Sequence, residues 1–170
     1  MKKILIPVDG TKGTKDIFTV FSSVVRPAEE VILLHVEQLG GKTLMLDMLG
    51  EAEMATLRES VEGTEFKERL DEKAGKIIAH CKGKLEAIGA QNIRTLVREG
   101  VPAAEILKVA ADEKVDLIIL GYNNKTGLGR LLSGSVTKDV ERGARVPVLV
   151  AKNDGREEGS LAWREAYAAR

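Results

Sequence analysis

The sequence has one cysteine, no excess of charge of either sign, and no long apolar run. A lone Cys81 cannot form a disulfide within the chain, so a disulfide-stabilised fold is excluded and a reducing compartment is expected. The 26 basic residues balance the 26 acidic ones, which leaves no charge signature for nucleic acid or an anionic membrane. No run reaches the roughly 18 apolar residues of a membrane span. The short run Ile4–Val8 also ends too early, at Asp9, for a signal peptide. We therefore expect a cytoplasmic protein that binds neither nucleic acid nor membrane.

The 170 residues, 44% hydrophobic and 31% charged, suit one globular domain with a substantial core. Short apolar runs alternate with segments of helical spacing. We expect strands at 3–8, 30–37, 93–98, 116–120 and 146–151, and helices at 14–25, at 64–88, from Pro102, and at 136–144. This alternation predicts an α/β fold, an open doubly wound parallel sheet with helices on both faces.

The long helix predicted at 64–88 carries an apolar stripe at steps of three and four. Its members are Phe66, Leu70, Ala74, Ile77, Cys81, Leu85 and Ile88. Cys81 on this stripe is expected to be a core residue. His35, inside an apolar strand, is likewise expected to be a buried histidine whose polar atoms are satisfied.

A glycine-rich stretch, GYNNKTGLGRLLSGSVT at 121–137, lies between a predicted strand and a predicted helix. Unpaired amides at a helix start attract anions, and glycines let a main chain approach a phosphate closely. The stretch is therefore either a phosphate-binding loop or a long connection whose glycines serve only turns.

Two known phosphate loops do not match this stretch. In a Walker A frame beginning at Gly129, Ser135 occupies the place of the required lysine. In a dinucleotide-binding frame beginning at Gly127, Leu132 occupies the place of the third glycine. The carboxyl ends of parallel strands share one edge, however, so Asp9, Val36 and Gly121 should meet there, where such sheets bind ligands. This convergence favours a nucleotide site. Asp9 also has the simpler reading of an Asp-Gly turn residue.

The spacing from Gly121 through position 124 to Gly134-Ser135 resembles the G-x2-G-x9-G-[ST] loop of ATP-binding universal stress proteins. Asn124 stands where that pattern has glycine, and asparagine is the residue other than glycine that best tolerates the left-handed region. The resemblance extends to ILIPVDGT, VILLHV, REGVPAAEILKVAADEKVDLIILG and SGSVTKDVERGARVPVLVAK. It covers about 1–37 and 85–152.

The resemblance implies a Rossmann-like, five-stranded sheet in the order 3-2-1-4-5 that binds ATP or AMP with Mg²⁺ or Mn²⁺. It also implies a role in the stress response. The residues themselves show no Ser/His/Asp set and no metal-ligand spacing, so no catalytic residue is predicted. The nucleotide-binding residues it implies are Pro7, Val8 and Asp9 near the adenosine, the Val36 main chain at the adenine edge, Gly121 and Asn124 at the ribose and first phosphate, and Gly134, Ser135 and Val136 at the phosphates.

A homodimer through the last strand, Val146–Ala151, is expected on two grounds. The family commonly dimerises there, and Pro147 indicates an apolar edge strand that is open to pairing. We expect one domain over 1–152, with an insertion at about 38–63 that is a capping helix or a lid. A tail at 153–170 is expected to be helical in part.

Two other functions stay open at this point. One is a dimeric adaptor of the same fold that binds no nucleotide, which Asn124 favours. The other is a small ATP-hydrolysing or nucleotidyl-transfer enzyme, although the sequence shows no evident general base.

Overall fold

The computed structural model describes residues 3–24, 28–38, 50–122 and 136–152. Within these ranges, no helix is long and apolar enough to cross a bilayer. The strands are β1 (Lys3–Pro7), β2 (Glu30–Glu37), β3 (Ile93–Glu99), β4 (Leu117–Gly121) and β5 (Val148–Ala151). The helices are α1 (Lys12–Val24), α2 (Glu51–Val61), α3 (Glu65–Ala87), α4 (Pro102–Asp112) and α5 (Val136–Gly143).

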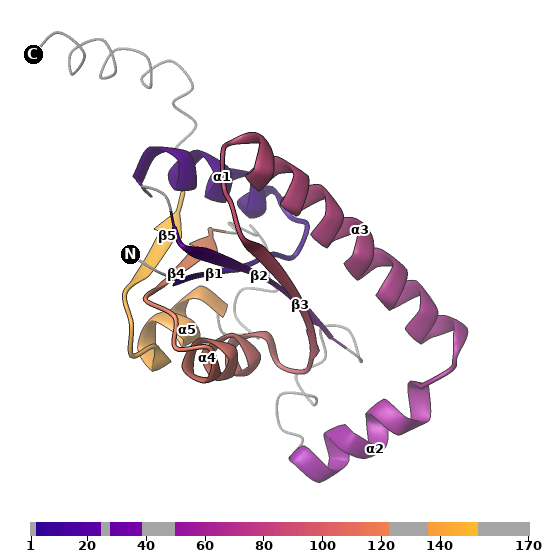
Figure 1. Ribbon diagram of the computed structural model, residues 1–170. Coiled ribbons are helices and arrows are strands. Elements are labelled where there is room, and N and C mark those ends of the chain that lie inside the picture. The colour runs from indigo at the N-terminus through magenta and orange to yellow at the C-terminus, as the bar shows by residue number, and fades with distance from the viewer. Residues whose placement is uncertain (1–2, 25–27, 39–49, 123–135, 153–170) are drawn as a thin grey trace, which may run out of the picture.

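The five strands form one parallel sheet in the order β3-β2-β1-β4-β5, which confirms the predicted fold class and strand order. Helices α1 and α3 cover one face, and α4 and α5 cover the other (Figure 1). The central strands are buried on both faces, which explains why they read as continuous apolar runs rather than alternating ones. The last strand lies at an edge, as Pro147 predicts, and begins one residue after it.

Each face of the sheet packs a separate apolar core. On the α1–α3 side, alternate strand residues such as Ile4, Ile6 and Leu33 pack with Cys81 and Leu85 of α3. On the α4–α5 side, the intervening strand residues pack with helix side chains. The buried members there are Leu5, Ile32, Leu34, Ile106, Val109, Ala110, Val115, Ile118, Leu120 and Val140. Cys81 is 1% exposed, as expected of a core residue, and burial raises the pKa of its thiol to about 11.

The predicted apolar stripe of α3 is wrong at its two ends. Phe66 is 45% exposed and Ile88 is 39% exposed, whereas Ala74, Cys81 and Leu85 are buried. The helix has 23 residues, or about 35 Å at 1.5 Å per residue, while β2 has eight residues, or about 26 Å at 3.3 Å per residue. The helix is therefore longer than the strand it crosses. Its buried apolar positions run from Ala74 to Leu85, and Ile88 is the C-cap residue after the helix has ended.

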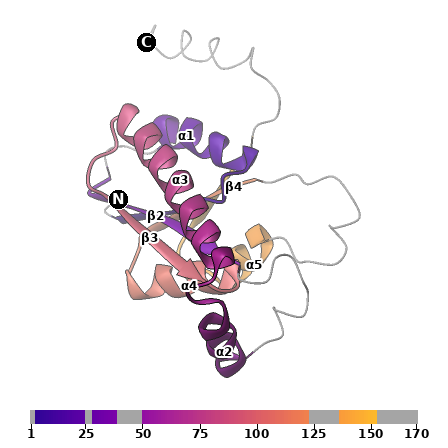
Figure 2. The same ribbon diagram turned by 90° about the vertical axis from the view of Figure 1, so that its right-hand side faces the viewer.

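The insertion predicted at 38–63 contains α2, and residues 39–49 lie outside the described ranges. Helix α2 precedes α3 in the chain and projects away from the sheet (Figures 1 and 2). Arg58 joins it to the end of β3, donating from Nη2 to the main-chain oxygen of Glu99 at 2.8 Å. The tail at 153–170 also lies outside the described ranges, so its predicted helix stays a prediction.

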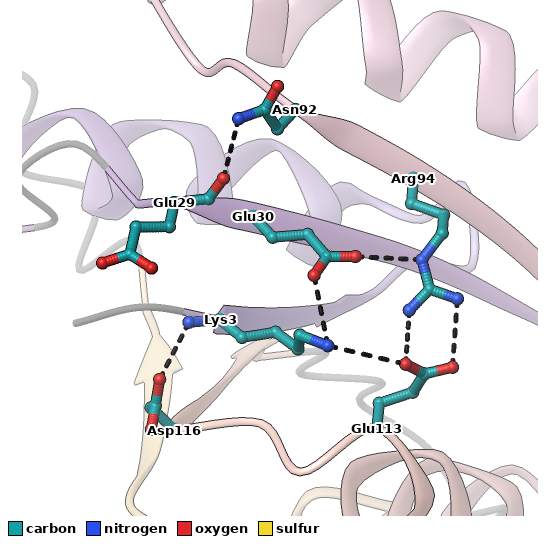
Figure 3. A network of polar contacts seen from close by, with 7 residues as sticks. All are labelled: Lys3, Glu29, Glu30, Asn92, Arg94, Glu113 and Asp116. Carbon is teal, nitrogen blue, oxygen red and sulfur yellow. Dashed lines mark hydrogen bonds and ion pairs between the residues drawn. The ribbon is translucent and has the colours of Figure 1, made fainter.

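Charged side chains connect the amino ends of the strands, at the edge opposite the predicted ligand site (Figure 3). Arg94 of β3 donates to Glu30 of β2 at 3.0 Å and forms a two-bonded pair with Glu113. Lys3 of β1 lies 3.1 Å from Glu30 and 3.7 Å from Glu113, and its main-chain N–H donates to Asp116 at 2.8 Å. This network holds the strand starts in register, which is a structural role.

Candidate functional site

The carboxyl ends of β1, β2 and β4 meet at one side of the sheet, which we call the carboxyl edge. Strand β1 lies between β2 and β4, and all three are parallel. The chain passes from β1 to β2 and β3 on one side, and then crosses to β4 and β5 on the other. The strand order reverses between β1 and β4, and open α/β sheets bind ligands at such a reversal. Of the sequence-predicted site residues, Pro7, Val8, Asp9, Val36 and Gly121 all lie at this edge.

Asp9 folds the chain that leaves β1. Its Oδ1 accepts hydrogen bonds from the main-chain N–H of Thr11 at 2.9 Å, from Thr11 Oγ1 at 2.6 Å and from Thr14 Oγ1 at 3.2 Å. Gly10 follows with φ +73°, and a Cβ there would lie 3.0 Å from Ile77 Cγ1, so only glycine fits this turn. Asp9 is therefore a turn residue, as the simpler interpretation of the sequence had it, and Oδ1 is the atom that stabilises the turn. Within the described ranges Oδ2 makes no hydrogen bond and remains available to a ligand.

The N–H and C=O of Val36 point toward the side of β2 on which β1 lies, just beyond the end of β1. In a strand the N–H and C=O of one residue point to the same side, and they switch sides at the next residue. The oxygen of Leu34 accepts from Val8 N–H at 2.8 Å, so Leu34 faces β1, whereas the oxygen of Glu37 accepts from Gly100 N–H at 3.0 Å and faces β3. Val36 therefore faces β1, and in the described part of the chain neither its N–H nor its C=O has a main-chain partner beyond the end of β1. This pair offers one donor and one acceptor at the carboxyl edge.

His35, next to Val36, is 8% exposed, and its Nδ1 lies 2.8 Å from the main-chain oxygen of Val8. The expectation of a buried, satisfied histidine is confirmed for that nitrogen. The same bond joins the ends of β1 and β2 beyond their last paired residues.

Gly121 and Val136 bracket the glycine-rich stretch. Gly121 ends β4, opposite Ala151 of β5, and the following residue, Tyr122, donates its N–H to the Ala151 oxygen at 2.8 Å. Val136 begins α5 and is 37% exposed. The other three predicted loop residues, Asn124, Gly134 and Ser135, lie outside the described ranges.

A buried ion cluster that sequence reasoning missed lies where β2 and β3 end. Lys67 of α3 is 8% exposed, and its Nζ lies 3.0 Å from Oε2 of Glu37, 2.8 Å from Oε1 of Glu99, and in contact with Asp71. Burial alone would lower the pKa of Lys67, but the hydrogen bonds that its ammonium donates to Asp71, Glu99 and Glu37 raise this pKa overall. Glu37 is 2% exposed, and its Oε1 has no partner in the described part of the protein. The cluster ties α3 to two strand ends at the carboxyl edge.

An open groove of about 650 Å³ runs along the outer side of β3. Its charged lining is balanced, with four cationic and four acidic side chains: Arg58, Lys67, Arg98, Lys108, Asp71, Glu99, Glu105 and Asp112. A groove of this composition has no net charge to attract a phosphate chain. It also lies beside the edge strand rather than at the strand reversal, so it is a poorer candidate for the ligand site.

One sequence signal pointed to the ion cluster. Lys67 and Asp71 are spaced i,i+4 on the long helix, as are the pairs Glu65–Arg69 and Glu72–Lys76, which are solvent-exposed. Spacing alone does not tell a buried pair from an exposed one, and the carboxylates of β2 and β3 that complete the cluster are distant in sequence.

Comparison with known proteins gives a consistent result. The model described as the universal stress protein family matches residues 1–152. The chain is 38% identical over 157 residues to universal stress protein MJ0577 of Methanocaldococcus jannaschii, a match that covers 89% of this chain and 94% of that protein. The solved structure of MJ0577 superposes with a TM-score of 0.66 at 35% identity, and covers 90% of this chain and 96% of that one.

Two more distant structures share the fold and hold nucleotides. A universal stress protein family protein from Arabidopsis thaliana with AMP bound has a TM-score of 0.59 at 14% identity, and covers 94% of this chain and 97% of that one. A universal stress protein from Archaeoglobus fulgidus in complex with dAMP has a TM-score of 0.54 at 20% identity, and covers 89% of this chain and 98% of that one.

Proposed function

The chain belongs to the universal stress protein family, and on that premise we propose that it binds an adenine nucleotide, ATP or AMP, at the carboxyl edge. In this proposal the protein is a regulatory homodimer that acts in the stress response, and any ATP hydrolysis is slow and incidental.

The observation that carries the proposal is the open N–H and C=O of Val36 beside the strand reversal. Adenine presents an acceptor, N1, next to a donor, the N6 amino group. A main-chain N–H and C=O on the same residue match that pair. Guanine presents a donor at N1 and an acceptor at O6, so the same main chain would face donor with donor and acceptor with acceptor. Unmatched buried polar groups are costly, so this arrangement supports selectivity for adenine.

The remaining predicted residues are assigned to the rest of the nucleotide. The Oδ2 of Asp9 is available to accept from a ribose hydroxyl, and the main chain at Pro7 and Val8 borders the adenosine. Gly121 and Asn124 would line the ribose and first phosphate.

The phosphates belong at the start of α5 in this proposal. Val136 is the first residue of that helix, and helix starts favour anions. Gly134 and Ser135, which precede it, are assigned to the phosphates by resemblance to the family. Within the described ranges, no group of three or more His, Cys, Asp or Glu side chains is arranged to hold a metal ion. An accompanying Mg²⁺ or Mn²⁺ would therefore be held chiefly by the phosphates.

The homodimer is proposed through β5. This strand pairs with β4 on one side, and Val148, Leu149 and Val150 are half-buried in the single chain. An apolar edge of this kind is suited to pairing with a second copy. Sedimentation of wild type and a Leu149→Lys variant would test it, with a dimer expected only for the wild type.

Isothermal titration calorimetry with ATP, AMP and GTP, each with Mg²⁺, tests the nucleotide proposal. We expect ATP or AMP to bind and GTP to bind at least about tenfold more weakly, because guanine would mispair two polar contacts and each costs about 1–3 kcal/mol. Gly134→Val should abolish binding by filling the phosphate loop. Gly75→Val is the matched control, since a Cβ at Gly75 on α3 meets nothing within 4 Å. Absence of heat with millimolar ATP and AMP would refute the proposal.

The adaptor that binds no nucleotide is favoured by one observation, Asn124 in the place of the second loop glycine. Mass spectrometry of the purified native protein separates the two readings. A co-purifying adenine nucleotide supports the first, and ligand-free protein that also shows no calorimetric heat supports the adaptor. Steady ATP turnover well above background would instead support an enzyme.

A further inference from the structure

The hydrogen-bond ladder between β1 and β2 stops one bond early. Val8 N–H donates to the Leu34 oxygen at 2.8 Å, as a parallel ladder requires. The next bond of that ladder would run from Val36 N–H to the Val8 oxygen, because a strand residue bonds the two partners that flank its register mate. Among the described residues, no main-chain bond joins Val36 N–H to the Val8 oxygen.

A side chain takes the place of the missing donor. Nδ1 of His35 lies 2.8 Å from the Val8 oxygen, and the contact is buried. A carbonyl oxygen only accepts hydrogen bonds, so the proton must sit on Nδ1 of His35. Val8 itself is 5% exposed, so its oxygen needs an internal donor.

We propose that His35 is a positioning residue for base recognition. By occupying the Val8 oxygen, the imidazole keeps the N–H of Val36 out of the sheet ladder and open to the acceptor nitrogen of the base. This inference rests on the proposed nucleotide site, and it adds a role for a side chain that does not itself touch the ligand.

The energetics favour this exchange of donors. If the imidazole is removed, the Val8 oxygen is left without a partner in a buried position, which is unfavourable. The donor in ladder register is Val36 N–H, so the ladder should then close by one bond. The base would lose its main-chain donor even though no ligand-contacting residue had changed.

Two variants of His35 separate the hydrogen bond from packing. Leucine is apolar and fits a core position. Asparagine has nearly the same shape as leucine, and its amide nitrogen stands the same number of bonds from Cα as Nδ1 of histidine. His35→Leu therefore removes the donor, and His35→Asn restores one. His80→Leu and His80→Asn are matched controls, because His80 on α3 is exposed.

The first measurement is amide hydrogen exchange of Val36 by NMR in the nucleotide-free protein. We expect the Val36 amide to exchange at least about tenfold more slowly in His35→Leu than in wild type, since it gains an internal bond, and to exchange at the wild-type rate in His35→Asn. Equal rates in wild type and His35→Leu would overturn the proposal, and so would slow exchange in His35→Asn. A long-range ¹⁵N spectrum should also show the proton on Nδ1 of His35.

The second measurement is binding of ATP and of 1-deaza-ATP, which has C–H in place of N1. We expect wild type to prefer ATP by about tenfold, His35→Leu to bind both equally weakly, and His35→Asn to regain the preference. An undiminished preference in His35→Leu would overturn the role of His35. If wild type binds neither compound, the proposed function fails, whereas the exchange measurement still decides whether His35 controls the Val36 amide.

Discussion

Replacing Lys67 with methionine tests the buried ion cluster that connects α3 to the carboxyl edge. Methionine keeps most of the length and packing of the side chain and removes its charge. Glu37 would then keep its charge at 2% exposure without the ammonium that lies 3.0 Å away. Its other carboxylate oxygen already lacks a partner in the described part of the protein, so no second contact compensates.

The expected cost is large because the pair is buried. Removing one partner of a buried ion pair typically costs about 3–5 kcal/mol. Lys67 retains 8% exposure and also contacts Asp71, which is itself exposed, so we expect the lower end, about 3 kcal/mol. In the double variant Lys67→Met/Glu37→Gln no isolated charge is left at position 37, and at least about 1 kcal/mol of the loss should be recovered.

Urea unfolding followed by far-ultraviolet circular dichroism measures these differences. Lys76→Met is the matched control, because Lys76 pairs with Glu72 at 2.5 Å on the exposed side of the same helix, and its removal should leave the midpoint unchanged. A Lys67→Met variant within about 1 kcal/mol of wild type would refute the reasoning, as would a double variant whose loss equals the sum of the two single losses.

Three further outcomes follow from the described geometry. Asp9→Ala should lower the free energy of unfolding by about 1 kcal/mol, because Thr11 and Thr14 lose the acceptor of the turn before α1. Asp9→Asn should keep the stability and weaken ATP binding, as urea unfolding and calorimetry would show. Although partial burial raises the pKa of Glu30, bonds from Arg94 and Lys3 lower it overall, and the bond from Arg94 lowers that of Glu113. The two carboxylates therefore stabilise the fold above pH 4.5, the ordinary pKa of a glutamate, and this stabilisation is lost as the pH falls below that value. In Arg94→Met the urea midpoint should depend less on pH across this range than it does in wild type. Cys81 should react with a thiol reagent only on unfolding, because it is 1% exposed and its pKa is about 11, and rapid labelling of native protein would contradict this.

Most of the fold could be predicted because its signals are local. Buried parallel strands leave continuous apolar runs, and β2 at Glu30–Glu37 was predicted to the residue. Pro147 placed the last strand at an edge for a simple reason, the missing N–H donor. The prediction failed where packing depends on distant parts of the chain. Phe66 and Ile88 continue the helical period of α3, but Phe66 precedes the part of the helix that packs on the core, and Ile88 is the C-cap residue after the helix has ended.

The sequence predicts which edge of the sheet holds the candidate site, but it does not predict the side-chain contacts around that site. Strand ends that converge on one edge follow from the alternation of strands and helices, so Asp9, Val36 and Gly121 could be placed together. The contact of His35 with the Val8 oxygen, in the place of a main-chain donor, depends on where β1 ends relative to β2. The spacing of residues in the sequence does not show where that is. The family assignment rests on several ordered segments rather than on the glycine loop, and it is confirmed by a match over residues 1–152.

The most direct test of the account follows the Val36 amide in a ¹⁵N-labelled sample during titration with ATP and Mg²⁺. The account predicts that the Val36 amide resonance moves downfield in step with calorimetric saturation and becomes protected from solvent exchange, because its N–H then donates to the base. Saturation by ATP with the Val36 amide unshifted and still exchanging freely would contradict it.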